Sequence, residues 1–305
     1  MNIAVFGIGG VGGYIGARLA RYAAGQADLR VNFITRGAML EAIRAGGLAL
    51  QTPEETFTAR PALATRDPRD CGPLDLVLLC TKTYHIEEAA RQMAAVVGPQ
   101  TAVLPLLNGV DSAGRLRALL PETQVISGCI YISAAVTGPG SVHYISGPGR
   151  VLFGAEEGPF GRGPALEELL RAAGIPAEYR ADILTALWEK YLFIEPFASA
   201  GSLTGLTLGG LRETPKQLSL LEGLLRELET LAAARRVPLP ENIHQATVDK
   251  FFAFPPATKT SMQVDFEKGR QTELESFSGY VTRAARAAGI PAPLHEQVYA
   301  ALKDR

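Results

Sequence analysis

Residues 2–16 read NIAVFGIGGVGGYIG, and this stretch decides the fold of the N-terminal half. Residues 2–6 form a short apolar run typical of a buried strand, and residues 14–24 carry apolar side chains at helical spacing. Between them, Gly7, Gly9 and Gly12 fit the pattern GxGxxG. A strand, a glycine turn and a helix in direct succession predict the start of a βαβ unit that binds a dinucleotide.

Each glycine of this turn has a separate physical role. Gly7 allows the tight turn, Gly9 lets the backbone approach a pyrophosphate, and Gly12 lets the helix pack closely on the strand. Backbone N–H groups at the helix N-terminus would face the phosphates. An unliganded glycine turn is the alternative. The residues expected to bind the cofactor in this turn are Gly7, Ile8, Gly9, Gly10, Val11 and Gly12.

Further apolar runs predict a doubly wound parallel sheet. They cover residues 30–34, 74–80 and 101–107, and helical or mixed segments such as residues 86–97 separate them. Nearly continuous apolar runs are typical of strands buried on both faces, so polar residues at the strand ends must carry the chemistry. Residues 124–155 alternate between apolar and polar side chains, which predicts antiparallel strands along one edge of this sheet.

Three polar residues, Arg36, Lys82 and Asn108, follow the ends of predicted strands. Domains specific for NAD usually have an acidic residue near the position of Arg36, where it binds the ribose 2′-hydroxyl. A guanidinium there suits a 2′-phosphate, and no carboxylate lies beside it in the sequence, so the predicted cofactor is NADPH. Lys82 and Asn108 would lie in the ligand crevice. The alternatives are solvated surface side chains and an ordinary Asn-Gly turn.

Residues after 180 read almost entirely as helix with short loops. The sequence therefore predicts an α/β dinucleotide-binding domain over residues 1–180 and an all-α domain over residues 181–305. A helix from residue 182 onward places Lys190 on an apolar stripe with Leu187, Ile194 and Phe197. Such a lysine either extends to water or stays desolvated beside a carboxylate, with a pKa suited to proton transfer.

Farther along the chain, Thr260 and Ser261 are expected to begin another helix. Thr272 and Glu275 fit a capping box, which gives Glu275 a structural role. Glu273 has no such role, and a plain acidic residue in a first helical turn is the alternative to a place in a site.

Composition excludes several classes of function. The 30 basic and 31 acidic residues are mixed along the chain, so no electrostatic footprint for nucleic acid or an anionic membrane is present. Neither a signal segment nor a membrane-spanning apolar run is expected. Cys71, Cys80 and Cys129 lack the spacing of a disulfide framework or a zinc site, so no metal is predicted. We expect a reduced, cytoplasmic protein whose partner is a small molecule.

Taken together, these residues resemble the ketopantoate reductase (2-dehydropantoate 2-reductase) family over nearly the whole chain. The resemblance implies NADPH-dependent reduction of a 2-keto acid, most simply ketopantoate to pantoate in pantothenate and coenzyme A synthesis. It implies that Lys190 protonates the ketone oxygen, that Glu273 fixes a substrate hydroxyl, and that Ser261 binds the carboxylate. The shared motifs are residues 2–16, Lys82, Asn108-Gly109, Trp188-Glu189-Lys190, Thr260-Ser261-Met262, Thr272-Glu273 and residues 289–303.

This chain departs from the family pattern on the helix of Lys190. Family members usually have asparagines four and eight positions after the lysine, where they contact the substrate, whereas this chain has Ile194 and Ala198. Each buried hydrogen-bonding group left unpaired lowers discrimination for a hydroxylated substrate by about 1–3 kcal/mol. Glu195 is one residue that could take over these contacts. The substrate site implied by the resemblance comprises Asn108, Lys190, Ile194, Ala198, Ser261 and Glu273.

Three functional readings therefore stay open: a ketopantoate reductase, a reductase of a more apolar 2-keto acid, and an NADP-binding sensor without turnover. A proton donor in an apolar setting argues against the sensor. A homodimer is an open alternative for the oligomeric state.

Overall fold

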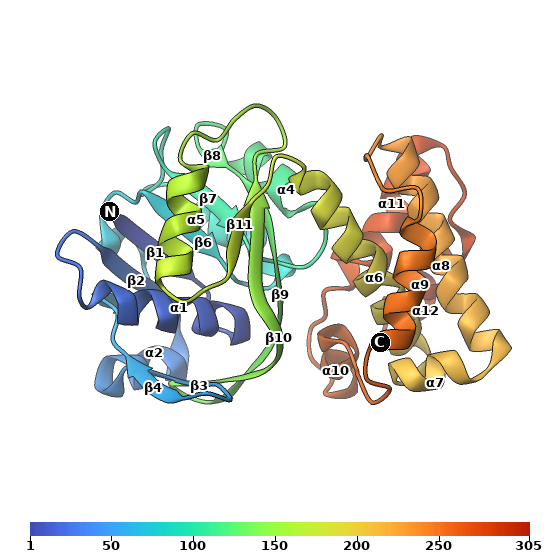
Figure 1. The fold of residues 1–305 in the computed structure, drawn as a ribbon, viewed down its shortest axis with the longest axis horizontal. Helices are drawn as coiled ribbons and strands as arrows, with labels where there is room; N and C mark the ends of the chain where they lie inside the picture. The colour runs from blue at the N-terminus through green and yellow to red at the C-terminus, as the bar shows by residue number, and fades with distance from the viewer. The chain divides into compact units, whose positions relative to one another are not determined.

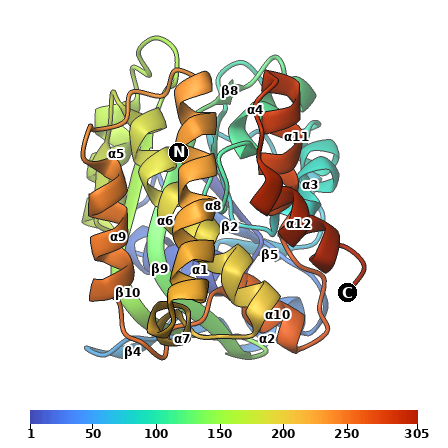
Figure 2. The same ribbon diagram turned by 90° about the vertical axis from the view of Figure 1, so that its right-hand side faces the viewer.

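The computed structural model describes residues 1–305, and the chain divides into two compact units. The first comprises Met1–Leu107 and Ser112–Ile183, and the second comprises Asn108–Asp111 and Leu184–Arg305. Strands and helices mix in the first unit (Figure 1), whereas helices make up the second (Figure 2). The predicted fold class, a Rossmann-like doubly wound sheet followed by an all-α C-terminal region, is confirmed.

A six-stranded parallel sheet forms the centre of the first unit, with strand order β5-β2-β1-β6-β7-β8. The chain moves outward from β1 in one direction and then restarts at β6 on the other side. This reversal is the topological switch point, where ligands bind in such sheets. The strands are β1 (Asn2–Phe6), β2 (Arg30–Ile34), β5 (Leu63–Thr65), β6 (Leu76–Leu79), β7 (Ala102–Pro105) and β8 (Gln124–Val125).

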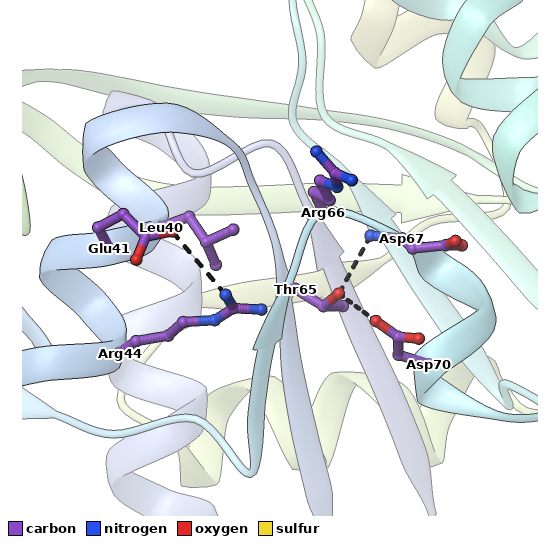
Figure 3. A pocket seen from close by; sticks show the side chains of 7 residues that line it. All are labelled: Leu40, Glu41, Arg44, Thr65, Arg66, Asp67 and Asp70. Carbon is purple, nitrogen blue, oxygen red and sulfur yellow. Dashed lines mark hydrogen bonds and ion pairs between the residues drawn. The ribbon is translucent and has the colours of Figure 1, made fainter.

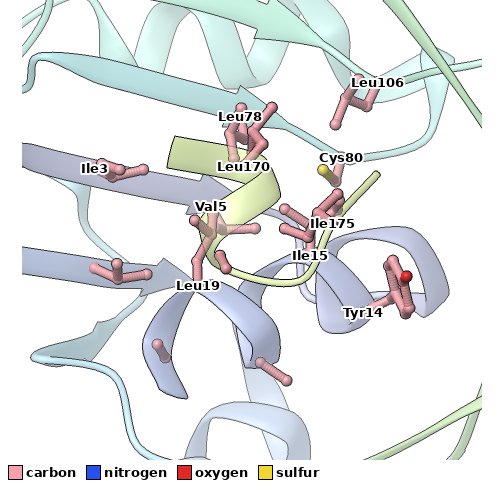
Figure 4. Packing of buried hydrophobic residues seen from close by; sticks show 14 of the residues in the cluster. Ile3, Val5, Tyr14, Ile15, Leu19, Leu78, Cys80, Leu106, Leu170 and Ile175 are labelled. Atoms are coloured by element: carbon pink, nitrogen blue, oxygen red, sulfur yellow. The ribbon is translucent and has the colours of Figure 1, made fainter. Parts of the chain in front are cut away.

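Helices cover both faces of this sheet, because alternate residues of each strand point to opposite sides. On β1, Ile3 and Val5 belong to a cluster that includes helices α1 and α5, which Figure 4 shows around Ile15 and Leu170. Phe6 belongs to a second cluster with α3 and α4. Each fully buried side chain of this kind contributes about 1.5–3 kcal/mol, so the sheet is a rigid base. The helices are α1 (Gly10–Ala23), α2 (Gly37–Gly46), α3 (Ile86–Met93), α4 (Ser112–Leu119) and α5 (Gly163–Ala172).

The prediction that residues 124–155 extend the edge of the parallel sheet is wrong for most of that segment. Only β8 joins the edge, and it pairs in parallel. β9 (Ser127–Gly138) and β10 (Ser141–Gly154) pair antiparallel in a second sheet with β3 (Leu48–Gln51), β4 (Thr56–Ala59) and β11 (Ala177–Tyr179).

This second sheet packs against α1, which explains the error. A Cβ at Gly10 would lie 2.1 Å from the carbonyl oxygen of Ala134, and one at Gly13 would lie 2.4 Å from Val142. The apolar periodicity of β9 and β10 therefore reflects burial against a helix. Periodicity reports that a face is buried, and it does not identify the partner.

Helices of the second unit surround a separate apolar core. α8 contacts α9, α11 and α12, and Figure 2 shows it between α9 and the other two. Leu224 and Leu228 of α8 are fully buried there with Val281 of α11. No helix of the chain is both long enough and apolar enough to span a membrane. The elements are α6 (Ile183–Thr204), α7 (Leu208–Glu213), α8 (Pro215–Ala234), α9 (Ile243–Ala253), α10 (Ser261–Glu267), the short 3-10 helix η3 (Leu274–Ser276), α11 (Ser278–Ala288) and α12 (Pro293–Leu302).

Candidate functional site

The glycine turn lies at the carboxyl end of β1. Gly7 has a φ of +95°, a value that residues with a side chain rarely adopt, and α1 begins at Gly10. A Cβ at Gly12 would lie 1.9 Å from the carbonyl oxygen of Gly7, so only glycine permits this packing. A Cβ at Gly9 would meet no atom within 4 Å. The first turn of α1 has no acidic residue, so this open space at a helix N-terminus fits a pyrophosphate.

Lys82 lies beside this turn, within the first unit. The backbone N–H of Cys80, directly after β6, donates to the carbonyl oxygen of Phe6 at 2.8 Å. A Cβ at Gly7 would lie only 2.9 Å from the Thr81 nitrogen. Lys82 is half-buried and precedes the short 3-10 helix η2 (Thr83–His85). The predicted lysine is therefore at the switch point of the sheet.

Arg36 lies at the N-terminus of α2, two residues after β2 ends, and 72% of its side chain is exposed. Sequence neighbours gave no sign of a nearby carboxylate, but α3 brings Glu88 Oε1 to 4.0 Å from Arg36 Nη1. His85 Nδ1 lies 3.7 Å from the other oxygen of Glu88. An exposed ion pair of this kind contributes only about 0–1 kcal/mol. A 2′-phosphate at Arg36 would therefore compete with Glu88 for the guanidinium, at small cost.

An open pocket of about 420 Å³ lies between α2 and the end of β5 (Figure 3). Arg44 Nε donates to the carbonyl oxygen of Ala64 at 3.0 Å, and Arg44 Nη1 lies 3.8 Å from Glu41 Oε1. Three of the lining residues are acidic, which disfavours a phosphate here. Arg36 has the less acidic surroundings of these two arginines. The lining residues are Leu40, Glu41, Arg44, Thr65, Arg66, Asp67 and Asp70.

Lys190 and Asn108 lie together in the second unit. Lys190 is half-buried on α6, and its Nζ donates a hydrogen bond to Asn108 Oδ1 at 3.1 Å. Asn108 follows β7, but the short segment Asn108–Asp111 groups with the helices. Gly109 turns the chain there with a φ of +92°, and a Cβ on it would lie 3.3 Å from the carbonyl oxygen of Ser276. A strand-end residue and a helix residue thus form one polar pair.

Glu273 is 3% exposed and directly precedes η3. Its carbonyl oxygen accepts the backbone N–H of Ser276 at 2.9 Å. The Tyr191 hydroxyl, next to Lys190 on α6, donates to the carbonyl oxygen of Ser276 at 2.9 Å. The segment that carries Glu273 is therefore fixed to the helix that carries Lys190.

The capping box predicted at Thr272 and Glu275 is wrong. The N-cap residue of the short η3 is Glu273 and not Thr272, and it makes no side-chain cap hydrogen bond. The Glu275 carboxylate instead accepts hydrogen bonds from Arg283 and from the Tyr299 hydroxyl, the latter at 2.6 Å. The Glu275 side chain therefore binds residues of α11 and α12 and does not cap the backbone near Thr272. The spacing of residues in the sequence does not reveal these partners.

Ser261 is the first residue of α10, so the predicted helix start is confirmed. The Thr260 hydroxyl accepts the backbone N–H of Gln263 at 3.3 Å, and Ser261 itself is exposed. A Cβ at Gly201 of α6 would lie 2.9 Å from Gln263 Oε1. Glycine at this position therefore lets α10 pack against the helix of Lys190.

Ile194 and Ala198 follow Lys190 by one and two turns of α6. Ile194 is half-buried, and Ala198 is fully buried in the apolar core of the helical unit. Glu195 cannot replace the missing asparagines, because it is fully buried and both of its oxygens have partners. Ser199 donates to one oxygen at 2.6 Å, and the ring of His295 lies 2.9 Å from the other.

Sequence reasoning missed one residue in each unit, Glu88 in the first and His295 in the second. Glu88 lies in the first turn of α3, the helix that follows β6 and Lys82, so its place near the ligand edge was a usable signal. His295 lies in a tail that packs 100 residues away on Glu195, and no local pattern marks it.

An α/β unit with a glycine turn at its switch point, followed by a helical unit with a partly buried lysine, defines an oxidoreductase of the dinucleotide-dependent type. Residues 3–158 match the family model described as ketopantoate reductase PanE/ApbA, and residues 182–305 match the model of its C-terminal part. The chain belongs to the ketopantoate reductase family.

Individual relatives agree with this assignment along the full length of the chain. The 2-dehydropantoate 2-reductase of Mesorhizobium japonicum is 29% identical over 324 aligned residues, covering 99% of this chain and 97% of that protein. The uncharacterised oxidoreductase YkpB of Bacillus subtilis is 28% identical, with 99% and 98% covered. The crystal structure of 2-dehydropantoate 2-reductase from Porphyromonas gingivalis W83 has 36% sequence identity and a TM-score of 0.84, with 99% and 98% covered.

Proposed function

We propose that the chain is an NADPH-dependent reductase of a 2-keto acid and that its substrate is 2-dehydropantoate, which it reduces to pantoate for pantothenate and coenzyme A synthesis. The observation that carries the proposal is the hydrogen bond between Lys190 Nζ and Asn108 Oδ1 on a half-buried face. An oriented ammonium is the proton donor that reduction of a ketone requires.

Residues of the first unit would hold the cofactor. Gly9 leaves open space at the N-terminus of α1, where backbone N–H groups suit a pyrophosphate. The fork of Arg36 suits a 2′-phosphate, and Lys82 lies beside the glycine turn. When bound, NADPH supplies the hydride that reduces the carbonyl carbon.

Residues of the second unit would supply the proton and hold the substrate. The Lys190 ammonium donates a proton to the carbonyl oxygen, so the ketone gains one hydride and one proton and becomes an alcohol. An ammonium carries three N–H donors, and the bond to Asn108 uses one of them and orients the group. Glu273 would accept a hydrogen bond from the substrate hydroxyl, and the Ser261 hydroxyl would donate to the carboxylate.

A more apolar 2-keto acid is the second candidate substrate. The half-buried Ile194 favours it, because this side chain offers no hydrogen bond where family members usually have an asparagine. The similarity to 2-dehydropantoate 2-reductases favours 2-dehydropantoate.

Initial rates of NADPH oxidation with 2-dehydropantoate and with branched and aromatic 2-keto acids test the proposal. We expect the highest kcat/KM with 2-dehydropantoate. A higher value with an apolar keto acid would select the second candidate. NADPH binding by fluorescence without turnover of any keto acid would refute a reductase and favour the sensor.

A further inference from the structure

Three charged or titratable side chains from three helices meet inside the helical unit. His295 of α12 lies between Glu195 of α6 and Glu227 of α8. Its Nε2 is 2.9 Å from Glu195 Oε2, and its Nδ1 is 2.7 Å from Glu227 Oε2. The side chains of His295 and Glu195 are 0% exposed, and that of Glu227 is 12% exposed. Burial alone would lower the pKa of His295, but the two carboxylates outweigh it and raise this pKa to about 9, so the imidazole is charged at neutral pH.

Such a network is a poor means of stabilising a core. Removing ions from water costs several kcal/mol for each ion, and well-packed apolar residues often stabilise equally well. A buried charged group of this kind therefore calls for a role in fixing geometry, which is the use that is best attested for it.

The second oxygen of Glu195 connects this network to the segment that carries Glu273. Glu195 Oε1 accepts hydrogen bonds from Ser199 at 2.6 Å and from Ser278 at 3.3 Å, and the two serine oxygens lie 2.5 Å apart. Ser278 begins α11, directly after the segment that carries Glu273. One carboxylate thus joins α6 and α12 to this segment.

Tyr191 adds a second connection to the same segment. Its hydroxyl donates to the carbonyl oxygens of Ser276, at 2.9 Å, and Phe277, at 3.2 Å. Tyr191, Glu195 and Ser199 are spaced four residues apart, so they form one stripe along α6. Each stripe residue lies directly after a predicted substrate-facing residue, namely Lys190, Ile194 and Ala198. A step of one residue turns about 100° around a helix, so the two stripes are adjacent.

We propose that the stripe of Tyr191, Glu195 and Ser199, braced by His295, is a positioning device that fixes Glu273 relative to Lys190. None of these residues touches the reacting atoms. They act by holding residues 276–278 against α6, so that the proton donor and the residue for the substrate hydroxyl keep a constant separation. The inference rests on the proposed function, because it assigns these two side chains to one substrate.

Glu195→Gln tests the device, because it keeps the shape of the side chain and removes the charge that holds His295. We expect kcat to fall by about 10- to 100-fold, since a misplacement of about 1 Å can cost on the order of 100-fold. The Kd for NADPH should stay unchanged, because the glycine turn lies in the other unit. Amide hydrogen exchange over residues 273–278 should become faster. Where Glu195→Gln fails to fold, Ser278→Ala removes one link and keeps the charges. We then expect a smaller fall of kcat, an unchanged Kd for NADPH and a smaller rise in exchange over residues 273–278.

His244→Gln is the matched control. His244 Nδ1 lies 2.9 Å from Glu229 Oε1, so it is also a histidine–carboxylate pair of the helical unit, but it joins α9 to α8. We expect unchanged kcat and unchanged exchange over residues 273–278. A lower melting temperature for Glu195→Gln or Ser278→Ala with wild-type kcat, KM and exchange would overturn the positioning role. A wild-type chain inactive on every keto acid would instead refute the proposed function, and the exchange measurement would still decide whether Glu195 holds the segment.

Discussion

Lys190 and Asn108 are 82 residues apart in the sequence, and the Lys190 ammonium donates a 3.1 Å hydrogen bond to the Asn108 side-chain oxygen. The bond lies within the helical unit because residues 108–111 leave the sheet and pack with the helices. The amide oxygen fixes the direction of the ammonium without neutralising its charge. This bond therefore suits the proton-donating role proposed for Lys190.

Replacing Asn108 changes this partner in two informative ways. Asn108→Ala should lower kcat by about tenfold or more, because the ammonium loses its orientation. Asn108→Asp places a carboxylate beside the ammonium and favours its charged form, so the fall of kcat at alkaline pH should move to higher pH than in the wild type. A pH profile of kcat measures this shift. An unmoved alkaline limb in Asn108→Asp would contradict the role given to Lys190.

Two glycines of the same turn should respond differently to alanine. Gly9→Ala should leave the melting temperature nearly unchanged and weaken NADPH binding, because its Cβ meets no atom of the protein but enters the space proposed for the pyrophosphate. Gly12→Ala should destabilise the fold by a few kcal/mol or more, because its Cβ would lie 1.9 Å from the Gly7 carbonyl oxygen. Thermal unfolding and fluorescence titration separate the two effects. Equal loss of stability in both variants would disprove the assignment.

Arg36→Ala should weaken NADPH binding far more than NADH binding, because only NADPH carries the 2′-phosphate. Arg21→Ala is the control, since Arg21 pairs with Glu55 on the same unit at 2.7 Å. Glu88→Gln should have the opposite effect and tighten NADPH binding modestly, by removing the carboxylate that lies 4.0 Å from Arg36. Equal losses of NADPH and NADH affinity in Arg36→Ala would rule out a 2′-phosphate site there.

His295 should make the stability of the chain pH-dependent. Its pKa is raised in the fold to about 9 from an ordinary value of 6.5, so its contribution is fully present below pH 6.5 and is lost as the pH rises through 9. The groups that face it are the carboxylates of Glu195 and Glu227. We expect the melting temperature to fall by several degrees over this range, because a pKa raised from 6.5 to about 9 corresponds to about 3 kcal/mol of stability.

His295→Gln has no titrating ring and should lose this pH dependence. Melting temperatures at pH 6.5 and pH 9 for both proteins are the measurement. If the melting temperature of His295→Gln falls between pH 6.5 and pH 9 as much as that of the wild type, another group is responsible for the pH dependence.

Ile194→Asn restores the side chain that family members usually have at this place. If the substrate is 2-dehydropantoate, the preference for it over an apolar keto acid should rise by about 5- to 150-fold, as expected for a gain of roughly 1–3 kcal/mol. The ratio of the two kcat/KM values measures this preference. A ratio that falls in the variant would show that residue 194 does not face the substrate hydroxyl.

Much of the fold was predictable because its signals are local. The strand, glycine turn and helix at residues 2–24 follow one another directly, and β2 occupies the predicted residues 30–34. The placement of β9 and β10 was not predictable, because burial against α1 and burial in the first sheet give the same alternation. β3 likewise pairs with β10, which is distant in sequence, whereas its other partner, β4, follows it directly along the chain.

The candidate site divides in the same way. Lys190 was recognisable because a charged side chain on an apolar helix face is unusual. Arg36 was recognisable because polar residues that follow the strands of a parallel sheet lie where ligands bind. Glu195 also lies in an apolar run, which indicates a buried carboxylate. Its hydrogen-bond partner His295 is 100 residues away, so the sequence does not identify that partner. Glu88 reaches Arg36 only through the fold of α3 against the sheet.

Transfer of deuterium tests the central claim most directly. NADPH that carries deuterium at both hydrogen positions of nicotinamide carbon 4 is incubated with the chain and 2-dehydropantoate, and the product is analysed by mass spectrometry and NMR. We predict pantoate with one deuterium at carbon 2, formed by the wild type and lost to background in Lys190→Ala. Absence of deuterated pantoate, or wild-type product formation by Lys190→Ala, would contradict the mechanism.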